Sequence, residues 1–453
     1  MARAVSRRTS ARGGATAALA AAALVACAGP KELEVDARPA PRPTAANAAY
    51  SDNGEPAPIE RPRPLAPVAT SGAPAGPVGS VVAVSAGSAH TCALYQSGRV
   101  ACWGDNGVGQ AGGPPTRDAG SDPHWVALPA RARQVVAGFF VTCALDDPGQ
   151  IWCWGVFEAG TIRSGGAVAG STALPDTPQL HAIGTPRPVV LAAGSGSVTR
   201  IALSLENPRA CAVRGREVVC WKTGEVSDNP PFVMPELAVA EGERIVDLAV
   251  GAGRSCVIVE AAPSRPGETA GKRRIECWQS GAKPATADWP AGAEPIEITL
   301  GTLHLCARDA AATVACWRIG VAPGWWTKPA TRIRHPNGKG WRSVSAGADF
   351  ACAVDADGRV GCFLAEPEGL PDDVVATAWA APRADARLVA GVEHASTVAA
   401  GAGHNVFGHG YACALSTSAP AGAIACWGDG ESGQLGDGKR PASSAPVMAV
   451  VPR

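Results

Sequence analysis

Fourteen of the 15 cysteines in this 453-residue sequence fall into seven closely spaced pairs, and this pattern limits the fold more than any other feature. In six pairs the second cysteine is followed by tryptophan, and in the remaining pair it is followed by Phe363. The seven pairs are Cys92 and Cys102, Cys143 and Cys153, Cys211 and Cys220, Cys256 and Cys277, Cys306 and Cys316, Cys352 and Cys362, and Cys413 and Cys426. A motif that returns at a regular spacing indicates that the chain is built from structural repeats.

One repeat is clearest in the stretch from residue 81 to 110, VVAVSAGSAHTCALYQSGRVACWGDNGVGQ. Apolar and small residues alternate up to Gly87, and two further apolar segments flank the turn sequence Gln96-Ser97-Gly98. This pattern predicts three short strands, the last two joined as a β-hairpin with a three-residue loop. In that hairpin the two cysteines of the pair are direct cross-strand neighbours.

Cysteines that face each other across a hairpin are well placed for a disulfide. Opposed residues in a non-hydrogen-bonded pair bring their Cβ atoms close to the roughly 3.8 Å that the bond requires. Free thiols in a packed core and zinc ligands are the two alternatives. Zinc ligands usually lie about two to four residues apart and two such pairs must converge, whereas these pairs lie on separate repeats. We therefore expect seven disulfides, each within its own hairpin.

Seven repeats over residues 80–453 have an average length of about 53 residues, which is typical of a propeller blade. Most repeats open with a strand that ends at a glycine, and the loop after the tryptophan strand is often followed by proline and an apolar run. These features predict four short strands per repeat, and helical periodicity is missing. The predicted fold is all-β, a seven-bladed β-propeller with one hairpin disulfide per blade.

Residues 1–27 have the features of an export signal. Four arginines precede a short apolar run, and the run ends at Leu24-Val25-Ala26-Cys27, which resembles the lipobox of a bacterial lipoprotein signal peptide. A transmembrane anchor is the alternative, but about eleven apolar residues are too few to cross a bilayer, which requires around 20. The resemblance implies that Cys27 is lipidated, and lipidation also accounts for the one cysteine that has no hairpin partner.

Residues 28–79 are rich in proline and alanine and have almost no large apolar side chains, which predicts a disordered tether ahead of the propeller. No later apolar run is long enough to span a membrane, so the lipid is the only expected membrane contact. Ala28 follows Cys27, in place of the aspartate that retains lipoproteins in the inner membrane of model Gram-negative bacteria. We expect an exported chain anchored at the bacterial envelope, at the outer membrane or cell surface, where disulfides can form.

The first and last repeats share a longer motif than the others. The first contains AGSAHTCAL, GRVACWGDN and then Gly109-Gln110, and the last contains IACWGDG followed by GQLGDG. This motif resembles the repeat of the regulator of chromosome condensation family. The resemblance extends over residues 80–453 and implies a seven-bladed β-propeller. The middle repeats depart from the pattern, because only His90 and His304 precede their cysteines as the family histidine does and the Asn-x-x-Gly-Gln segment is missing from the second to the sixth repeat.

The best-known member of that family exchanges guanine nucleotide on a small nuclear GTPase and binds chromatin. We expect neither activity, because an exported bacterial chain meets no such GTPase, and 40 basic and 40 acidic residues give no net positive field for nucleic acid. The fold also occurs in secreted bacterial inhibitors of β-lactamases, in which one propeller face grips an enzyme. The expected function is that of a monomeric scaffold that binds an envelope or extracellular protein or a glycan.

No recognisable motif indicates catalysis, since the sequence has no Gly-x-Ser-x-Gly elbow, no His-Glu-x-x-His and no phosphate loop. We expect no cofactor and no enzyme activity. The alternative is a hydrolase whose dispersed active site is assembled from several blades at one propeller face. A metal site at His394, His404 and His409 is not expected, because their spacing follows no ligand rule.

The tryptophans that follow the cysteines are expected to pack between blades, because they point to the opposite strand face from the cysteine. Trp325, Trp326 and Trp341 fall outside this regular pattern, around the loop between the fifth and sixth repeats. Exposed aromatic side chains of this kind form binding patches for proteins or glycans. The alternative is that they are loop residues folded onto a blade.

Overall fold

The computed structural model describes fourteen parts of the chain. They are residues 78–158, 180–191, 196–222, 237, 239–251, 253–263, 271–279, 283–289, 294–302, 304–319, 330–364, 385–403, 410–417 and 422–452. The regular structure of these residues consists of 27 strands, and they contain no helix. None of them therefore forms a helix long and apolar enough to cross a membrane.

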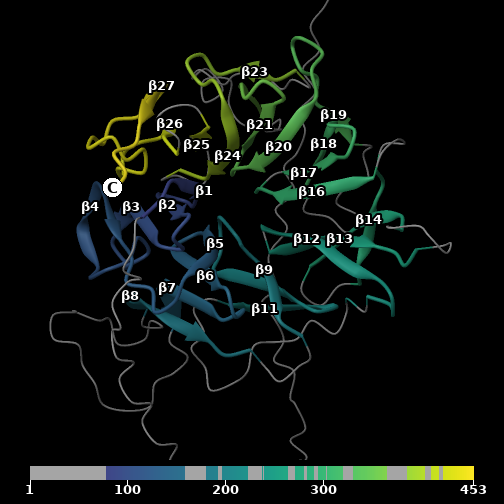
Figure 1. Cartoon of the computed structure of the whole chain (residues 1–453), viewed down its shortest axis with the longest axis horizontal. Coiled ribbons are helices and arrows are strands. Elements are labelled where there is room, and N and C mark those ends of the chain that lie inside the picture. The colour runs from purple at the N-terminus through teal and green to yellow at the C-terminus, as the bar shows by residue number, and fades with distance from the viewer. Residues whose placement is uncertain are drawn as a thin grey trace, which may run out of the picture. The chain divides into compact units, whose positions relative to one another are not determined.

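The strands form seven sheets, the blades of a propeller, and each sheet is built from strands that are consecutive in sequence (Figure 1). Blades 1 and 2 contain β1 (Val81–Ala86), β2 (His90–Tyr95), β3 (Val100–Asn106) and β4 (Thr116–Trp125), then β5 (Ala132–Ala137), β6 (Val141–Asp146), β7 (Ile151–Glu158) and β8 (Leu180–Val189). Blades 3 and 4 contain β9 (Val198–Leu203), β10 (Arg209–Arg214) and β11 (Glu217–Lys222), then β12 (Arg244–Gly251), β13 (Arg254–Glu260), β14 (Arg273–Gln279) and β15 (Ala285–Ala287).

Blades 5 and 6 contain β16 (Pro295–Leu300), β17 (His304–Asp309), β18 (Val314–Arg318) and β19 (Thr331–Arg332), then β20 (Trp341–Ala346), β21 (Phe350–Asp355), β22 (Val360–Leu364) and β23 (Arg387–Leu388). Blade 7 contains β24 (Ala395–Gly401), β25 (Tyr411–Ser416), β26 (Ile424–Gly428) and β27 (Ser443–Met448). In the described residues blade 3 has three strands and each of the others has four. The predicted all-β, seven-bladed propeller is confirmed.

Every cysteine pair read from the sequence lies directly opposite its partner in the hairpin formed by the second and third strands of a blade, as Cys92 does with Cys102. All seven pairs are bonded, with Cα atoms 4.0 or 4.1 Å apart. The turn residue Gly98 has a φ of 80°, which a glycine adopts without strain. The alternation of the strands and the turn residues therefore set the register that brings each pair together.

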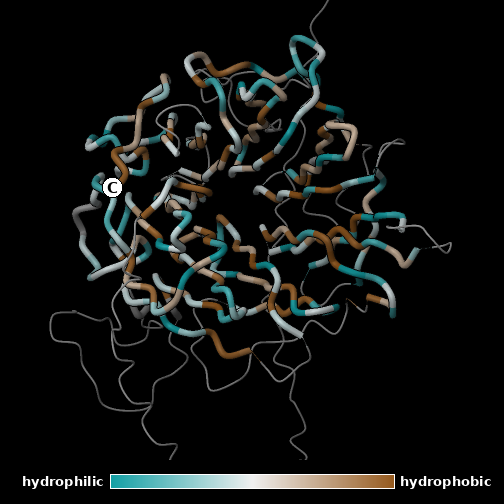
Figure 2. Tube along the Cα trace, viewed as in Figure 1, coloured by the Kyte–Doolittle hydropathy of each residue, from teal (hydrophilic) through white to brown (hydrophobic). Residues whose placement is uncertain are grey.

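The aromatic residue after the second cysteine packs against the disulfide of the preceding blade. Trp154 of blade 2, for example, shares a buried cluster with Cys92 and Cys102 of blade 1. The same arrangement holds around the ring for Trp221, Trp278, Trp317, Phe363 and Trp427, and it closes with Trp103 on the disulfide of blade 7. Apolar segments accordingly recur along the strands around the ring (Figure 2). Each disulfide thus staples its own blade and also offers a surface to the next one.

The first strand of each blade lies at the edge of its sheet, where backbone N–H groups lack a partner within that sheet. Polar side chains of the preceding blade accept hydrogen bonds from these groups. In three blades the acceptor is a serine or threonine that lies two positions before the corner glycine. Ser85 accepts from Ala137 N (2.9 Å), Thr299 accepts from Ala346 N (3.0 Å) and Ser345 accepts from Ala400 N (3.0 Å). The inner edges are therefore protected without any exchange of strands between blades.

One end of the propeller axis is filled by residues from several blades. We call the turn between the first and second strands of a blade its corner, and the residues that follow the corner glycines meet at the axis. Ser88 of blade 1 donates to the carbonyl oxygen of Leu205 in blade 3 at 3.0 Å. Leu205 also packs with Ala348 of blade 6 and Ala402 of blade 7 in a buried cluster. The corner end of the axis is therefore closed by protein.

The ring closes between blade 7 and blade 1 through side-chain hydrogen bonds. Tyr411 donates to the carbonyl oxygen of His90 at 2.6 Å, and Tyr95 donates to that of Pro452 at 2.8 Å. The carbonyl oxygen of Gln434 accepts from Thr91 and from Trp103 Nε1, both at 2.9 Å. Blade 7 takes its outer strand, β27, from the stretch directly after β26, so in the described residues no strand from another blade completes blade 7.

The substitution Tyr411→Phe is expected to destabilise the propeller by about 1–3 kcal/mol. It removes the hydroxyl, so the buried carbonyl oxygen of His90 keeps only its bond from Gly87 N, and Thr91 Oγ1 loses a partner at 3.1 Å. Tyr95→Phe is a matched control at the same interface, because its hydrogen bond is partly exposed to water and its loss is expected to cost about 1 kcal/mol or less. Urea unfolding measures both. Equal midpoints for Tyr411→Phe and the parent protein would contradict a role for this bond in closing the ring.

Candidate binding site

Trp341 is not part of an exposed aromatic patch. Its side chain is only 1% exposed, it packs in the core between blades 5 and 6, and its Nε1 donates to the carbonyl oxygen of Ile333 at 3.3 Å. The expectation of a binding role for this residue is therefore wrong, because Trp341 begins the innermost strand of blade 6 and faces its neighbour. Trp325 and Trp326 lie outside the described residues, and so does Cys27.

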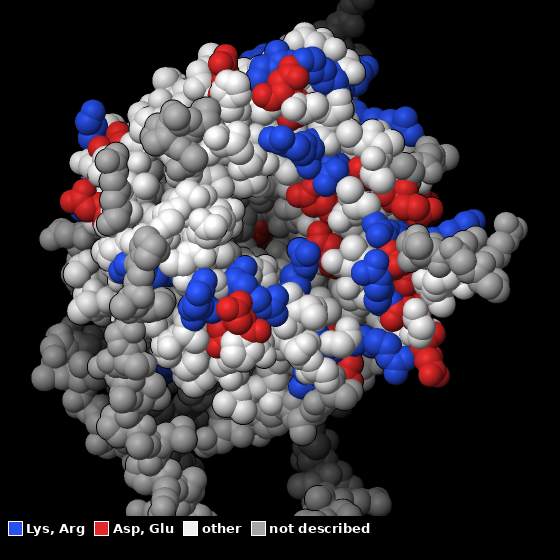
Figure 3. Space-filling view, viewed as in Figure 1, with Lys and Arg blue, Asp and Glu red and all other residues white. Residues whose placement is uncertain are grey.

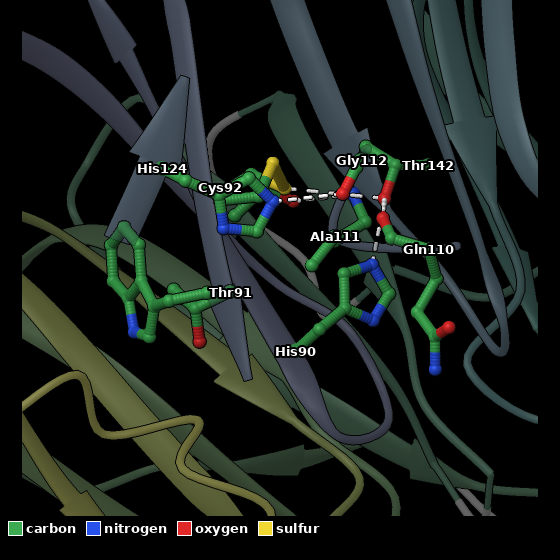
Figure 4. The surroundings of a disulfide bond; sticks show 12 residues. His90, Thr91, Cys92, Gln110, Ala111, Gly112, His124 and Thr142 are labelled. Carbon is green, nitrogen blue, oxygen red and sulfur yellow. Dashed lines mark hydrogen bonds between the residues drawn. A yellow bond between two sulfur atoms is a disulfide. The ribbon is translucent and has the colours of Figure 1, made fainter. Parts of the chain in front are cut away.

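The side chain of His90 links blade 1 to blade 2. Its Nε2 lies 2.7 Å from Thr142 Oγ1, a contact that Figure 4 draws as a dashed line. The threonine hydroxyl donates its hydrogen to the carbonyl oxygen of Gln110 at 2.8 Å, so His90 Nε2 is the donor in the first contact. Burial lowers the pKa of His90 to about 3, and that of His304 to about 4. Both rings are therefore neutral parts of the framework.

These two histidines make folding sensitive to acid. In the unfolded chain they bind protons below about pH 6.5, whereas in the folded protein they stay neutral down to about pH 3 and 4. Their contribution to stability is therefore complete above pH 6.5 and is lost as the pH falls. His90→Gln is expected to reduce the slope of unfolding free energy against pH by about 1.4 kcal/mol per unit between pH 4 and 6. Urea titrations across this range measure the slope, and an unchanged slope would contradict the assignment.

A hollow lies at the centre of the ring, with an acidic side chain inside it and charged side chains around it (Figure 3). The innermost strands of blades 3, 4 and 5 each place a charged residue four positions before the corner: Arg200, Asp247 and Glu297. Arg200 forms an ion pair with Asp247 at 2.7 Å, and Arg308 forms one with Glu297 at 2.7 Å. Since the corner end of the axis is filled, this polar hollow opens toward the hairpin turns.

The two carboxylates of the hollow are anchored to the backbone of the next blade. Asp247 accepts from Ile298 N at 3.0 Å and Glu297 accepts from Val344 N at 3.4 Å. Burial raises the pKa of both carboxyl groups, and the facing arginines oppose this effect. The side chain of Asp247 is 8% exposed, whereas that of Arg200 is 45% exposed. In this pair the accessible group is the arginine, whereas in the other pair Glu297 is 28% exposed and Arg308 is 18% exposed. The hollow thus offers both a donor and an acceptor to polar groups.

The sequence-based prediction of a binding site did not include these charged residues. The available signal was a charged residue inside an otherwise apolar opening strand, as in Val-Asp-Leu-Ala-Val-Gly from residue 246 and Ile-Glu-Ile-Thr-Leu-Gly from residue 296. Their convergence at one axis depends on the closed ring, which spacing along the chain does not reveal. Within the described part of the chain, no group of three or more His, Cys, Asp or Glu side chains is placed to hold a metal ion.

The fold, the disulfides and the polar axis define a class of protein, the disulfide-stapled seven-bladed β-propellers. Residues 81–110 match the model of the regulator of chromosome condensation (RCC1) repeat. The RCC1 domain-containing protein RUG3, mitochondrial, from Arabidopsis thaliana is 26% identical over 193 residues. This match spans 40% of the present chain and 40% of that relative. The chain therefore contains a segment that matches the RCC1 repeat.

The crystal structure of human WBSCR16 has a similar fold. Its TM-score is 0.53 at 15% sequence identity, and the match covers 78% of this chain and 94% of that chain. At this identity the likeness shows the fold alone. The match at residues 81–110 confirms the repeat motif that the sequence resembles. The described residues adopt the propeller architecture expected from that motif.

Proposed function

We propose that this RCC1-repeat propeller is a scaffold that binds a protein partner through the face around the axial hollow. The observation that carries the proposal is the concentration of charge around the hollow and over blades 3 to 6, with fewer charged side chains seen over blades 1 and 7 (Figure 3). Ion pairs in this sector include Arg274 with Glu243 at 2.7 Å and Arg334 with Asp385 at 2.6 Å. A surface with charges of both signs around a concave centre can steer a partner toward the site and fix its orientation there.

The proposal includes export and anchoring. Seven disulfides support an extracytoplasmic location, because reducing compartments keep thiols unpaired. Residues 1–27 would act as the lipoprotein signal, Cys27 would carry the lipid and residues 28–79 would tether the propeller to the envelope. Peptide mass analysis of protein from its native envelope tests this part. An unmodified Cys27 in a chain that retains Met1 would overturn it.

Chemical crosslinking in native envelopes, followed by affinity capture, tests the scaffold. Arg200→Gln removes an exposed charge at the hollow and keeps an amide near Asp247, so capture of crosslinked partners is expected to fall several-fold. Lys439→Gln removes an exposed charge in blade 7 and is the matched control. Equal capture by the parent and both variants would overturn the assignment of this face.

The alternative function is a hydrolase with a dispersed active site at one propeller face. It predicts turnover where the scaffold predicts saturable binding. Incubation of the purified chain with envelope glycans and peptides, with product formation followed by mass spectrometry, separates the two. Products that appear in proportion to the amount of chain would contradict the scaffold.

A further inference from the structure

The seven blades contain equivalent positions that can be compared directly. The first residue of the second strand, two positions before the first cysteine, is His90, Val141, Arg209, Arg254, His304, Phe350 or Tyr411 in blades 1 to 7. Burial keeps the two histidines neutral, so five of these positions carry no charge. The two arginines belong to neighbouring blades, 3 and 4. Charged residues at this position therefore occur only in blades 3 and 4, next to the corner of blade 3.

That corner also differs in length. In blades 1, 2, 4, 5 and 6 the segment from the corner glycine to this position has four residues, as in 87–90, whereas in blade 3 it runs from Ser204 to Arg209. The two extra residues bring Glu206 and Asn207 beside the arginines. Insertions in propeller loops leave the blades unchanged, so a corner altered in both length and charge is a place where a site is added to the fold.

Several polar atoms of this corner lack partners in the described structure. Glu206 Oε1, Asn207 Oδ1 and Arg209 Nε are all shielded from solvent without a hydrogen bond. Arg209 Nη2 donates to Ser255 Oγ at 3.3 Å. Arg254 Nε and Nη2 lie 3.2 Å from the side-chain oxygen of Gln279 when that amide is oriented to accept them. Shielded polar groups without partners are costly, which favours a ligand that satisfies two acceptors and one donor together.

The charge balance of the corner favours an anion. Two arginines face one carboxyl group, and burial raises the pKa of Glu206 to about 7, an effect that Arg254 opposes. Burial also lowers the pKa of Arg209 and of Arg254, because both guanidinium groups are held partly out of water. A peptide with a carboxylate presents the complementary set: an anionic acceptor for Arg209 and backbone N–H donors for Glu206 and Asn207.

We propose that the blade 3 corner, Glu206, Asn207 and Arg209 with Arg254 of blade 4, binds a carboxylate-bearing peptide segment of a protein partner. The carboxylate accepts from the guanidinium of Arg209, and an adjacent peptide N–H donates to the side chain of Asn207 or Glu206, since all three residues are only partly buried. This site lies at the opposite end of the axis from the open hollow, so it is independent of the face proposed above. The carboxylate is supplied either by the end of a chain or by an acidic side chain.

Ligand-observed NMR with the full oxidised chain tests the site. The probes are acetyl-trialanine with a free carboxylate and its amide, together with acetyl-Ala-Glu-Ala-amide and acetyl-Ala-Gln-Ala-amide. We expect the acid to bind at least about tenfold more tightly than its neutral counterpart in one of the two pairs, which identifies the source of the carboxylate. Equal affinity within both pairs would overturn the proposal, and so would inorganic phosphate competing as well as the better peptide.

Three variants complete the test. Arg209→Gln is expected to weaken the acidic probe about tenfold or more, whereas Arg216→Gln, an exposed arginine in the hairpin turn of the same blade, is expected to leave it unchanged. Glu206→Gln removes negative charge and is expected to tighten binding, a change that a purely structural role would not produce. Wild-type binding by Arg209→Gln, or weaker binding by Glu206→Gln, would overturn the proposal. Thermal melts confirm that each variant is folded, and the Arg200→Gln capture experiment reports separately on the opposite face.

Discussion

Complete reduction of the seven disulfides is expected to unfold the propeller at room temperature. Six of the bonds close loops of 9 to 13 residues and one closes a loop of 21. A loop of about ten residues contributes up to about 3 kcal/mol, so together the bonds contribute on the order of 10–20 kcal/mol. This is as large as the net stability of a typical domain, about 5–15 kcal/mol. Reduction followed by alkylation should therefore abolish the cooperative thermal transition.

Circular dichroism during heating measures this effect. An oxidised sample taken through the same alkylation buffer is the control, because it separates loss of the bonds from exposure to the reagents. A reduced and alkylated chain that still melts cooperatively within a few degrees of the control would contradict the prediction. It would mean that the cores between blades hold the ring together without the staples.

Trp154→Ala is expected to destabilise the protein by about 3–5 kcal/mol. Trp154 is fully buried and packs against the Cys92–Cys102 bond of the neighbouring blade, so its removal leaves a cavity at the interface of blades 1 and 2. Trp154→Phe should cost less than Trp154→Ala, because the phenyl ring fills part of the cavity and blade 6 uses Phe363 at the same position. Urea unfolding of the oxidised proteins gives both values.

Trp221 supplies a matched comparison for Trp154. It holds the equivalent position in blade 3 but is only partly buried against the disulfide of blade 2. Trp221→Ala is therefore expected to cost less than half as much as Trp154→Ala. Equal losses for the two alanine variants would show that burial against the disulfide is not the source of the stabilisation.

The regular features of this fold were predicted from sequence because they depend on residues close together in the chain. The spacing of Cys92 and Cys102 and the turn at Gly98 define a hairpin whose register follows from a period of two residues. The same local pattern repeats seven times, so the blade count followed from counting hairpins. The packing of tryptophans such as Trp154 between blades followed from the strand face to which they point.

The candidate sites depended on contacts that no local pattern encodes. Trp341 looked like an exposed aromatic beside an irregular loop, but it begins an inner strand and is buried by the neighbouring blade. Asp247 and Glu297 are about 50 residues apart in sequence and act on the same hollow only after the ring closes. Sequence spacing describes one blade at a time, whereas these contacts join different blades.

The sequence alone thus determined the repeat, the hairpin register and the cysteine pairing, since short-range alternation and turn chemistry are sufficient for them. The tertiary structure decided which blades touch. It showed that Tyr411 and Gln434 close the ring on blade 1, and that Ser88 and Leu205 fill one end of the axis. It also placed Glu206 of the blade 3 corner beside Arg254 of blade 4. The reason is physical: these contacts form between side chains distant in sequence, whose meeting depends on the curvature and closure of the whole ring.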